Sequence, residues 1–358
     1  MRTDYSPPQS KIFAFTLVLV LTSGVVARGH SHNGIQPAGA EGRRRRAASS
    51  IFEFHGGFWF NLHDFLYHQA RIRARQLAGD SDKAAGTSPG LADTEGLTPE
   101  QLRTWTAALD YYRNTWIKRD VVFDEEMVRI QGRLMASEAA ADLKGSGLQP
   151  ELAAALESAA PIYRAQWWAG QVRANRSWIE AVTPLVNRFG DALIRQLTAA
   201  YRAKWPGRRI RVDVVKFASG AGAYTTLDPV HITASSTDPR NQGSAALETL
   251  FHESSHALAG RSFGAVFEAL AREGRAQNKA IPGDLWHALL FYTTGEIVRR
   301  TLAKGGVNAY TPYAYRNGLY ARSPAWQKYQ RAFEQRWQPY LDGKTGFNDA
   351  IADLVSAL

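Results

Sequence analysis

Hydrophobic positions recur mostly with the three-to-four-residue period of an amphipathic helix. This period predicts helices within 52–76 and over 99–118, 122–144, 149–158, 161–204, 244–258, 262–277, 284–303 and 323–340. Apolar and polar residues alternate as in a strand over 210–217, and two further strands are expected over 223–227 and 230–235. We therefore predict an α+β fold that is predominantly α-helical, with a small antiparallel sheet just before the helix at 244–258.

The amino-terminal 27 residues have the pattern of an export signal. Arg2 and Lys11 supply positive charge, an apolar run covers 12–21, and Val25-Val26-Ala27 fits a small-residue cleavage site. The apolar stretch is short for a membrane span, which needs about 20 residues. We predict a signal peptide over 1–27, an exported protein that is periplasmic or extracellular, and no stable membrane span after cleavage, with an uncleaved anchor as the alternative.

The rest of the chain divides by composition. Residues 28–50, with the run Arg43 to Arg46, predict a basic flexible linker. The break at Trp205-Pro206-Gly207 separates a helical domain over 51–205 from a second domain over 206–358. Whether a pro-segment is removed stays open.

Composition restricts which groups can hold a metal, but it says little about binding partners. The sequence has no cysteine, which excludes disulfides and cysteine-ligated metals, so a metal must be held by His, Asp or Glu. The formal charge is +10, but outside the arginine run the basic residues are scattered along predicted helices. We read them as a solvated surface and expect no nucleic-acid partner. Nothing in the sequence indicates the oligomeric state.

The clearest chemical motif is His252-Glu253-Ser254-Ser255-His256. Two histidines four residues apart lie on one face of a helix, so both imidazoles can bind one ion, while Glu253 can reach a water on that ion. Zn²⁺ is the expected metal, because it accepts imidazole and carboxylate ligands and keeps one position for water.

This motif resembles that of the zincin superfamily of metallopeptidases, and more closely its thermolysin-like, gluzincin group. The likeness covers about residues 210–300, and no family is recognised for the amino-terminal half. It implies that His252 and His256 are zinc ligands and that Glu253 is the general base. It also implies an edge strand that pairs with an extended substrate, a role for which the segment 231–236 is placed.

The third ligand has two main candidates, and Glu268 and Glu273 are weaker rivals because their segment also carries Arg272 and Arg275. The position six residues after His256 is Ser262, so the third histidine of the metzincins is absent. In gluzincins the third ligand is a glutamate from a later helix, which favours Glu296. Its helix is apolar almost all round, and a buried carboxylate needs a cation or donors, with an ion pair to Arg299 or Arg300 as the alternative. His287 is the rival ligand, and the two side chains point to opposite faces of an unbroken helix, so only one should ligate.

Amide hydrolysis also needs a donor for the developing oxyanion. Tyr292, one turn before Glu296, is the nearest candidate, and His287 and His231 are others. The segment 310–320, rich in tyrosine, is a candidate loop over the cleft.

These observations predict a secreted zinc metallohydrolase, a peptidase in which Glu253 activates water to cleave a peptide or protein substrate. Two alternatives stay open. One is a zinc amidase acting on a cell-wall substrate. The other is a non-catalytic cell-envelope protein with a structural metal site, in which the metal would be fully coordinated.

Overall fold

The computed structural model describes residues 51–79, 90–207, 209–218 and 222–358. All of these residues fall in one unit that runs from Arg45 to Leu358. The predicted signal peptide and basic linker (1–27 and 28–50) lie outside the described residues. The fold is α+β and predominantly helical, which confirms the predicted class.

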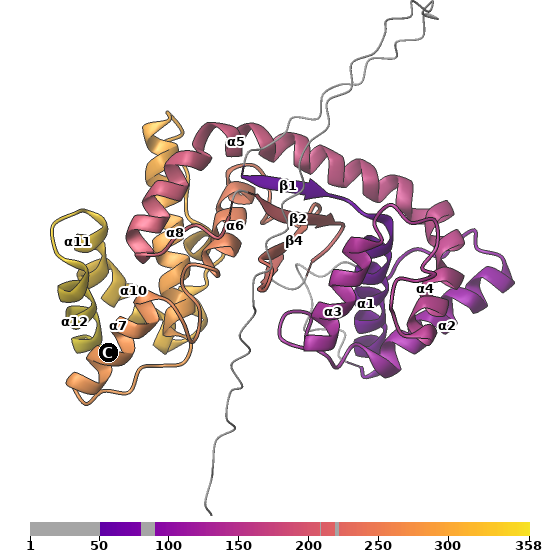
Figure 1. Cartoon of the computed structure of the whole chain (residues 1–358), viewed down its shortest axis with the longest axis horizontal. Helices are drawn as coiled ribbons and strands as arrows, with labels where there is room; N and C mark the ends of the chain where they lie inside the picture. Colours follow the sequence, from indigo (N-terminus) through magenta and orange to yellow (C-terminus); the bar gives the residue numbers. More distant parts are fainter. Residues whose placement is uncertain (1–50, 80–89, 208, 219–221) are drawn as a thin grey trace, which may run out of the picture. The chain divides into compact units, whose positions relative to one another are not determined.

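A single four-stranded sheet lies between two groups of helices (Figure 1). Its strands, in the order β1-β2-β4-β3, are β1 (Phe52–His55), β2 (Ile210–Val215), β4 (His231–Ser235) and β3 (Ala223–Thr226). β1 and β4 both run parallel to β2, and only β3 is antiparallel to its neighbour β4. The sheet is therefore mixed, where the sequence predicted an antiparallel one. β1 was not predicted, because four residues carry too little pattern and their partner strand lies far along the chain.

Four helices on one side of the sheet enclose a first hydrophobic core. They are α1 (Phe58–Leu77), α2 (Pro99–Thr115), α3 (Glu125–Ala136) and α4 (Pro150–Tyr163). Large aromatic side chains such as Trp105, Tyr112 and Tyr163 are almost completely buried among them. The predicted start of α2 is confirmed, because Thr98 accepts a hydrogen bond from the amide of Gln101 and the Gln101 side chain accepts one from Thr98.

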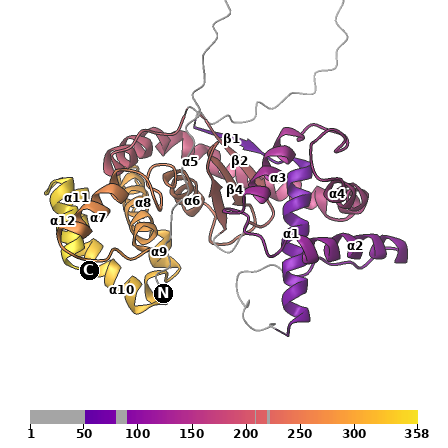
Figure 2. The ribbon, with the colours of Figure 1, turned by 60° about the horizontal axis from the view of Figure 1, so that its bottom comes forward.

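A long helix connects the two sides. After a π-helical turn (Arg164–Trp168), α5 (Ala169–Tyr201) passes along the sheet and reaches the carboxyl-terminal helices (Figures 1 and 2). From Trp178 onward its buried face belongs to the second core, with the sheet and the helices that follow it.

The carboxyl-terminal helices complete this second core. The longer ones are α6 (Ser244–Ser255), α7 (Ala265–Ala276), α8 (Leu285–Lys304), α10 (Pro324–Ala332) and α12 (Phe347–Ser356). Shorter turns lie between them: α9 (Tyr313–Arg316), a 3-10 turn (Tyr320–Arg322), a π-helical turn (Phe333–Trp337) and α11 (Gln338–Leu341). α12 was not predicted, although Phe347, Ile351 and Leu354 give it a buried helical stripe.

At the sheet, some residues pack in a different core from the elements next to them in the sequence or in the sheet. Ile51 and Phe52 precede α1 yet pack in the second core, while Val215 and Tyr224 come from the sheet and pack in the first. The domain boundary expected near residue 205 stays a prediction.

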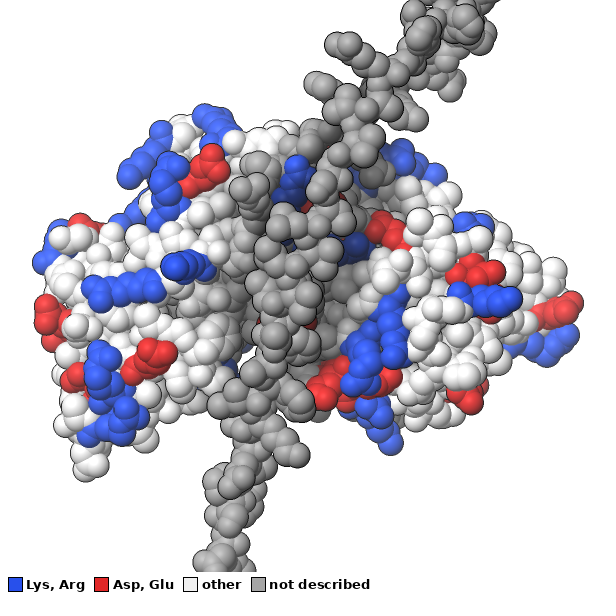
Figure 3. Space-filling view, viewed as in Figure 1, with Lys and Arg blue, Asp and Glu red and all other residues white. Residues whose placement is uncertain are grey.

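No helix in the described ranges combines the length and the apolar character needed to cross a bilayer. On the face seen in Figure 3, basic and acidic side chains are interspersed over both ends of the described part of the molecule.

Candidate metal site

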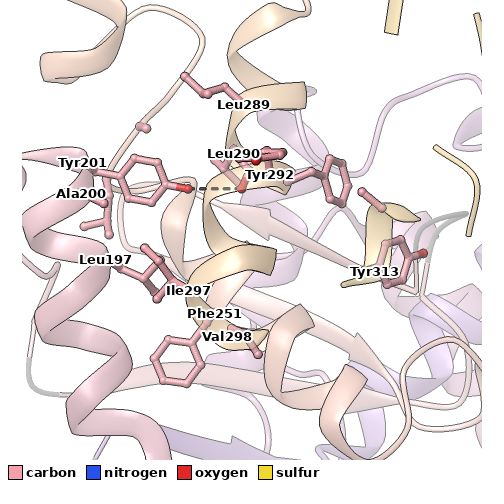
Figure 4. Packing of buried hydrophobic residues seen from close by; sticks show 14 of the residues in the cluster. Leu197, Ala200, Tyr201, Phe251, Leu289, Leu290, Tyr292, Ile297, Val298 and Tyr313 are labelled. Carbon is pink, nitrogen blue, oxygen red and sulfur yellow. Dashed lines mark hydrogen bonds between the residues drawn. The ribbon is translucent and has the colours of Figure 1, made fainter. Parts of the chain in front are cut away.

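The site is built on α6, which is buried on nearly every side. Leu247, Leu250 and Phe251 are fully buried, and the helix packs between α5 and α8 with β3 and β4 beside it. Figure 4 shows Phe251 among Leu197 of α5 and Val298 of α8. The hydroxyls of Ser254 and Ser255 donate to carbonyls four residues earlier in the same helix. These contacts fix the helix axis and hence the direction of the motif side chains.

Three imidazoles converge at the end of this helix. His252 lies in its last turn, and His256 is the first residue after it, still with helical backbone angles. With His287 of α8 they form a group in which one ring nitrogen from each lies within 4.8 Å of the others. The ring centroids are 5.1 Å apart for His252 and His256, 5.5 Å for His252 and His287, and 5.2 Å for His256 and His287.

Aromatic rings hold these imidazoles in place. Phe291 stacks on His252 with ring centroids 4.0 Å apart, and Trp286 stacks on His287 at 5.0 Å. Trp286 also meets the ring of His256 edge-on at 5.6 Å. Because both aromatic residues flank His287 on α8, the same helix supplies one imidazole and the packing that orients all three.

The electrostatic environment keeps the three imidazoles neutral. Burial lowers the pKa of His256 to about 3 and that of His287 to about 4, with the neighbouring imidazole adding to the effect on His256. Burial lowers the pKa of His252 well below its usual value, and the repulsion that a protonated His256 or His287 would exert acts in the same direction. Nδ1 of His252 is buried with no hydrogen-bond partner among the described residues. Neutral, convergent imidazoles with an orphaned nitrogen are the donor set that a divalent transition metal uses.

Glu253 is buried beside this group and bonded to the sheet. Its Oε2 accepts a hydrogen bond from the Thr225 hydroxyl at 2.7 Å, and its backbone oxygen lies 2.9 Å from the same hydroxyl. Nε2 of His256 lies 3.9 Å from that Oε2. Burial raises the pKa of Glu253 to about 7, although the bond from Thr225 acts in the opposite direction. A carboxyl group with this pKa can both take up and release a proton near neutral pH.

A second buried carboxyl group, Glu248, lies one helical turn before His252. It accepts hydrogen bonds from the Tyr310 hydroxyl at 2.5 Å and from the Tyr313 amide at 3.0 and 3.1 Å. Burial raises its pKa to about 7. Sequence analysis missed this residue, although its spacing from His252 is the signal that both face the same way. Glu248 fixes the segment at 310–313 against α6.

Glu296, the predicted metal ligand, lies outside the group of three imidazoles. Its carboxylate accepts hydrogen bonds from Arg299 at 2.7 Å and from Arg300 at 2.6 Å. These two guanidinium groups lower its pKa against the opposing effect of burial. The ion pair that was the alternative for Glu296 satisfies its charge, and His287, the rival candidate, is the residue that lies beside His252 and His256.

Two of the predicted oxyanion donors also lie elsewhere. The Tyr292 hydroxyl donates to Oε1 of Gln338 at 2.6 Å, away from the cavity at the imidazoles. His231 is buried in the sheet, with its Nε2 3.0 Å from Oδ2 of Asp213. Tyr313, from the tyrosine-rich segment, does line the cavity, and its ring stacks on Phe291 with centroids 5.9 Å apart.

A cavity of about 680 Å³ opens at this group. Its lining includes the three imidazoles, Glu253 and Glu248. β3 contributes Tyr224 and Thr225 to the same lining. The cavity is therefore large enough for several residues of an extended chain, and an edge of the sheet runs along it.

The edge strand differs from the predicted one. The segment 231–236 was expected at the edge, but β4 (His231–Ser235) lies inside the sheet, between β2 and β3. β3 is the outer strand on the cavity side, antiparallel to β4. Strand order depends on long-range pairing, which the alternation of residues does not reveal.

No family model, no curated protein and no solved structure matches this chain.

Proposed function

We propose that this protein is a secreted zinc-dependent hydrolase that cleaves peptide bonds, with Glu253 as the general base. The observation that carries the proposal is the convergence of three buried imidazoles and one buried carboxyl group on a single cavity. Neutral imidazoles and a carboxyl group with a pKa near 7 are the groups that metal-assisted hydrolysis requires at neutral pH.

His252, His256 and His287 would hold the metal. Three histidines fit zinc in a catalytic site, because they leave a fourth position for water or substrate. When bound, zinc would acidify a water molecule and stabilise negative charge on a carbonyl oxygen. A fully coordinated structural site would need a fourth protein ligand, and within the described ranges the group contains three residues. This count favours hydrolysis over the non-catalytic alternative.

Glu253 moves the proton. Its Oε2 is held by Thr225 and lies near His256, so the carboxylate faces the water that attacks the substrate. It accepts the proton of that water as the new carbon–oxygen bond forms. The protonated carboxyl group then delivers the proton to the leaving nitrogen, so that the peptide bond breaks to a carboxylate and an amine. Tyr313 lines the cavity and is our candidate donor to the oxyanion.

The outer strand supports a peptide substrate over other amides. β3 lies at the edge of the sheet and lines the cavity through Tyr224 and Thr225. An extended peptide can add to such an edge through backbone hydrogen bonds, which a branched glycan-linked amide does not offer. Because Thr225 also holds Glu253, a chain on this strand would lie beside the base. A cell-wall amidase remains the second candidate for the same chemistry.

The test is hydrolysis of an unstructured protein such as casein by the purified mature protein loaded with one equivalent of Zn²⁺. We expect cleavage that a chelator abolishes and added Zn²⁺ restores. A zinc-loaded protein that cleaves neither casein nor purified peptidoglycan would overturn the proposal. Cleavage of peptidoglycan alone would instead select the amidase.

A further inference from the structure

The cavity at the imidazoles has a second, apolar lining. Val122 and Phe123 come from the loop between α2 and α3, and Val128 comes from α3. Leu227 follows β3, and Phe263 lies in the loop after α6. These five residues, which we call the apolar wall, come from both halves of the chain. The first three belong to the amino-terminal half of the chain, outside the region in which the sequence resembles the zincins.

Exposed apolar side chains gather at this wall. Large hydrophobic side chains with high exposure in the described ranges are Leu77, Leu91, Leu102, Phe123, Leu227, Phe263 and Tyr315. Three of these seven line this one cavity: Phe123 is 83% exposed, Leu227 37% and Phe263 38%. Singly exposed apolar residues are ordinary, but a cluster rimmed by polar groups marks a binding site.

Phe123 is presented by an ordered turn. The carboxylate of Asp120 accepts hydrogen bonds from the amides of Val122 at 2.7 Å and Phe123 at 3.0 Å. Asp124, which follows Phe123, caps α3: its carboxylate accepts hydrogen bonds from the amides of Glu126 and Met127, both at 3.1 Å. The ring of Phe123 therefore projects from a turn whose backbone is held by hydrogen bonds both before and after this residue.

The base of the same turn is anchored in the first core. Val121 is buried, and its carbonyl oxygen accepts a hydrogen bond from the buried Gln131 side chain at 2.9 Å. A solvent-exposed phenylalanine on a segment fixed in this way is already ordered before a ligand binds. Binding therefore costs little conformational entropy of the protein.

We propose that the apolar wall is the specificity pocket for a large apolar side chain next to the cleaved bond, so that the substrates are peptide segments carrying Leu, Phe or Met there. This proposal rests on the proposed function, because it places the substrate in the cavity that holds Glu253 and the imidazoles. Two aromatic rings and three aliphatic side chains exclude water around such a residue, whereas a charged or hydroxyl-bearing side chain loses its hydration there.

Binding is measured separately from cleavage. The probes are fluorescein-labelled hexa-alanine peptides in which one position in turn carries Leu or Ser, titrated against the Zn²⁺-loaded Glu253→Gln variant. We expect at least one position at which Leu binds 10- to 100-fold more tightly than Ser. Phe123→Ala should reduce that ratio to within about threefold of unity, and Phe123→Leu should keep most of it.

Leu77→Ala is the matched control, because Leu77 is 65% exposed but does not line the cavity. It should leave the ratio unchanged. A wild-type ratio near unity at every position, or a ratio that survives Phe123→Ala, would overturn the pocket. If the ratio behaves as expected but the zinc-loaded wild type cleaves neither the Leu nor the Ser peptide, the apolar wall still binds a large apolar side chain while the hydrolase proposal fails, so the two failures are distinguishable.

Discussion

The hydroxyl of Thr225 lies 2.7 Å from Oε2 of Glu253 and joins the outer strand of the sheet to the motif helix. Because this bond stabilises the carboxylate, it opposes the effect of burial on the pKa of Glu253. The strand that borders the cavity therefore also affects the position and acidity of Glu253, the proposed base.

Replacing Thr225 by valine tests this coupling. Without the hydroxyl the pKa of Glu253 should rise further, so the acidic limb of the profile of kcat/KM against pH should move to higher pH by about one unit. Catalysis at the plateau should fall about tenfold through loss of positioning. Thr226→Val is the control, since its hydroxyl lies 3.4 Å from Nδ1 of His231 rather than at the base. An unmoved acidic limb in Thr225→Val would show that the bond has no role in tuning Glu253.

Removal of the base itself separates metal binding from catalysis. Glu253→Gln keeps the size of the side chain and an acceptor for Thr225 but cannot take up a proton. We expect kcat to fall by 10²- to 10⁴-fold while one equivalent of zinc remains bound. Zinc content by mass spectrometry and kcat on a peptide substrate measure the two effects. Full activity in this variant would remove Glu253 from the mechanism.

Glu248 should make stability depend on pH in a defined direction. Burial raises the pKa of this group from 4.5 to about 7, so its contribution to stability is fully present below pH 4.5 and is lost as the pH rises through about 7. Glu248→Gln removes the titration. Relative to the wild type, this variant should gain about 3 kcal/mol of unfolding free energy as the pH rises from 4.5 to 8.

A control of opposite sign is available in Glu296. Its pKa is lowered by Arg299 and Arg300, so its contribution is present above the unfolded pKa and is lost as the pH falls. Glu296→Gln should therefore lose stability relative to the wild type as the pH rises. Urea unfolding of the three proteins at several pH values measures both slopes. If the unfolding free energies of both variants, each relative to the wild type, changed with pH in the same direction, the opposite pKa shifts of Glu248 and Glu296 would be contradicted.

Close packing of α6 against α8 gives a further prediction. A Cβ atom at Gly295 would lie 3.0 Å from Oε1 of Glu248 and 2.8 Å from Cβ of Pro312. Gly295→Ala should therefore destabilise the fold by about 1–3 kcal/mol through overpacking. In Gly132→Ala, where no atom lies within 4 Å, the same change should stabilise α3 by about 0.5–1 kcal/mol. Thermal unfolding of both variants checks the contrast, and equal shifts would contradict it.

The sequence was sufficient for those parts of the site that depend on local spacing. His252 and His256 are one helical turn apart at the end of α6, and their spacing predicted that the two imidazoles lie together. The three strands at 210–215, 223–226 and 231–235 also follow from local patterns. Each of these features is determined by residues within a few positions of one another.

Choosing between His287 and Glu296 required the tertiary structure. Both lie on α8, on opposite faces of the helix, and only the tertiary packing decides which face turns toward α6. The arginines three and four residues after Glu296 were visible as partners, and they prove to satisfy its charge. The contact between Thr225 and Glu253 depends in turn on strand order, because β3 rather than β4 lies at the edge.

Metal content of matched variants tests the three-histidine site most directly. Wild type, His287→Ala and Glu296→Ala, purified alike and dialysed against a weak zinc buffer, are compared by the zinc bound per chain. We predict one equivalent in the wild type and in Glu296→Ala, and at least a 100-fold weaker affinity in His287→Ala. Retention of zinc by His287→Ala together with its loss from Glu296→Ala would contradict this account.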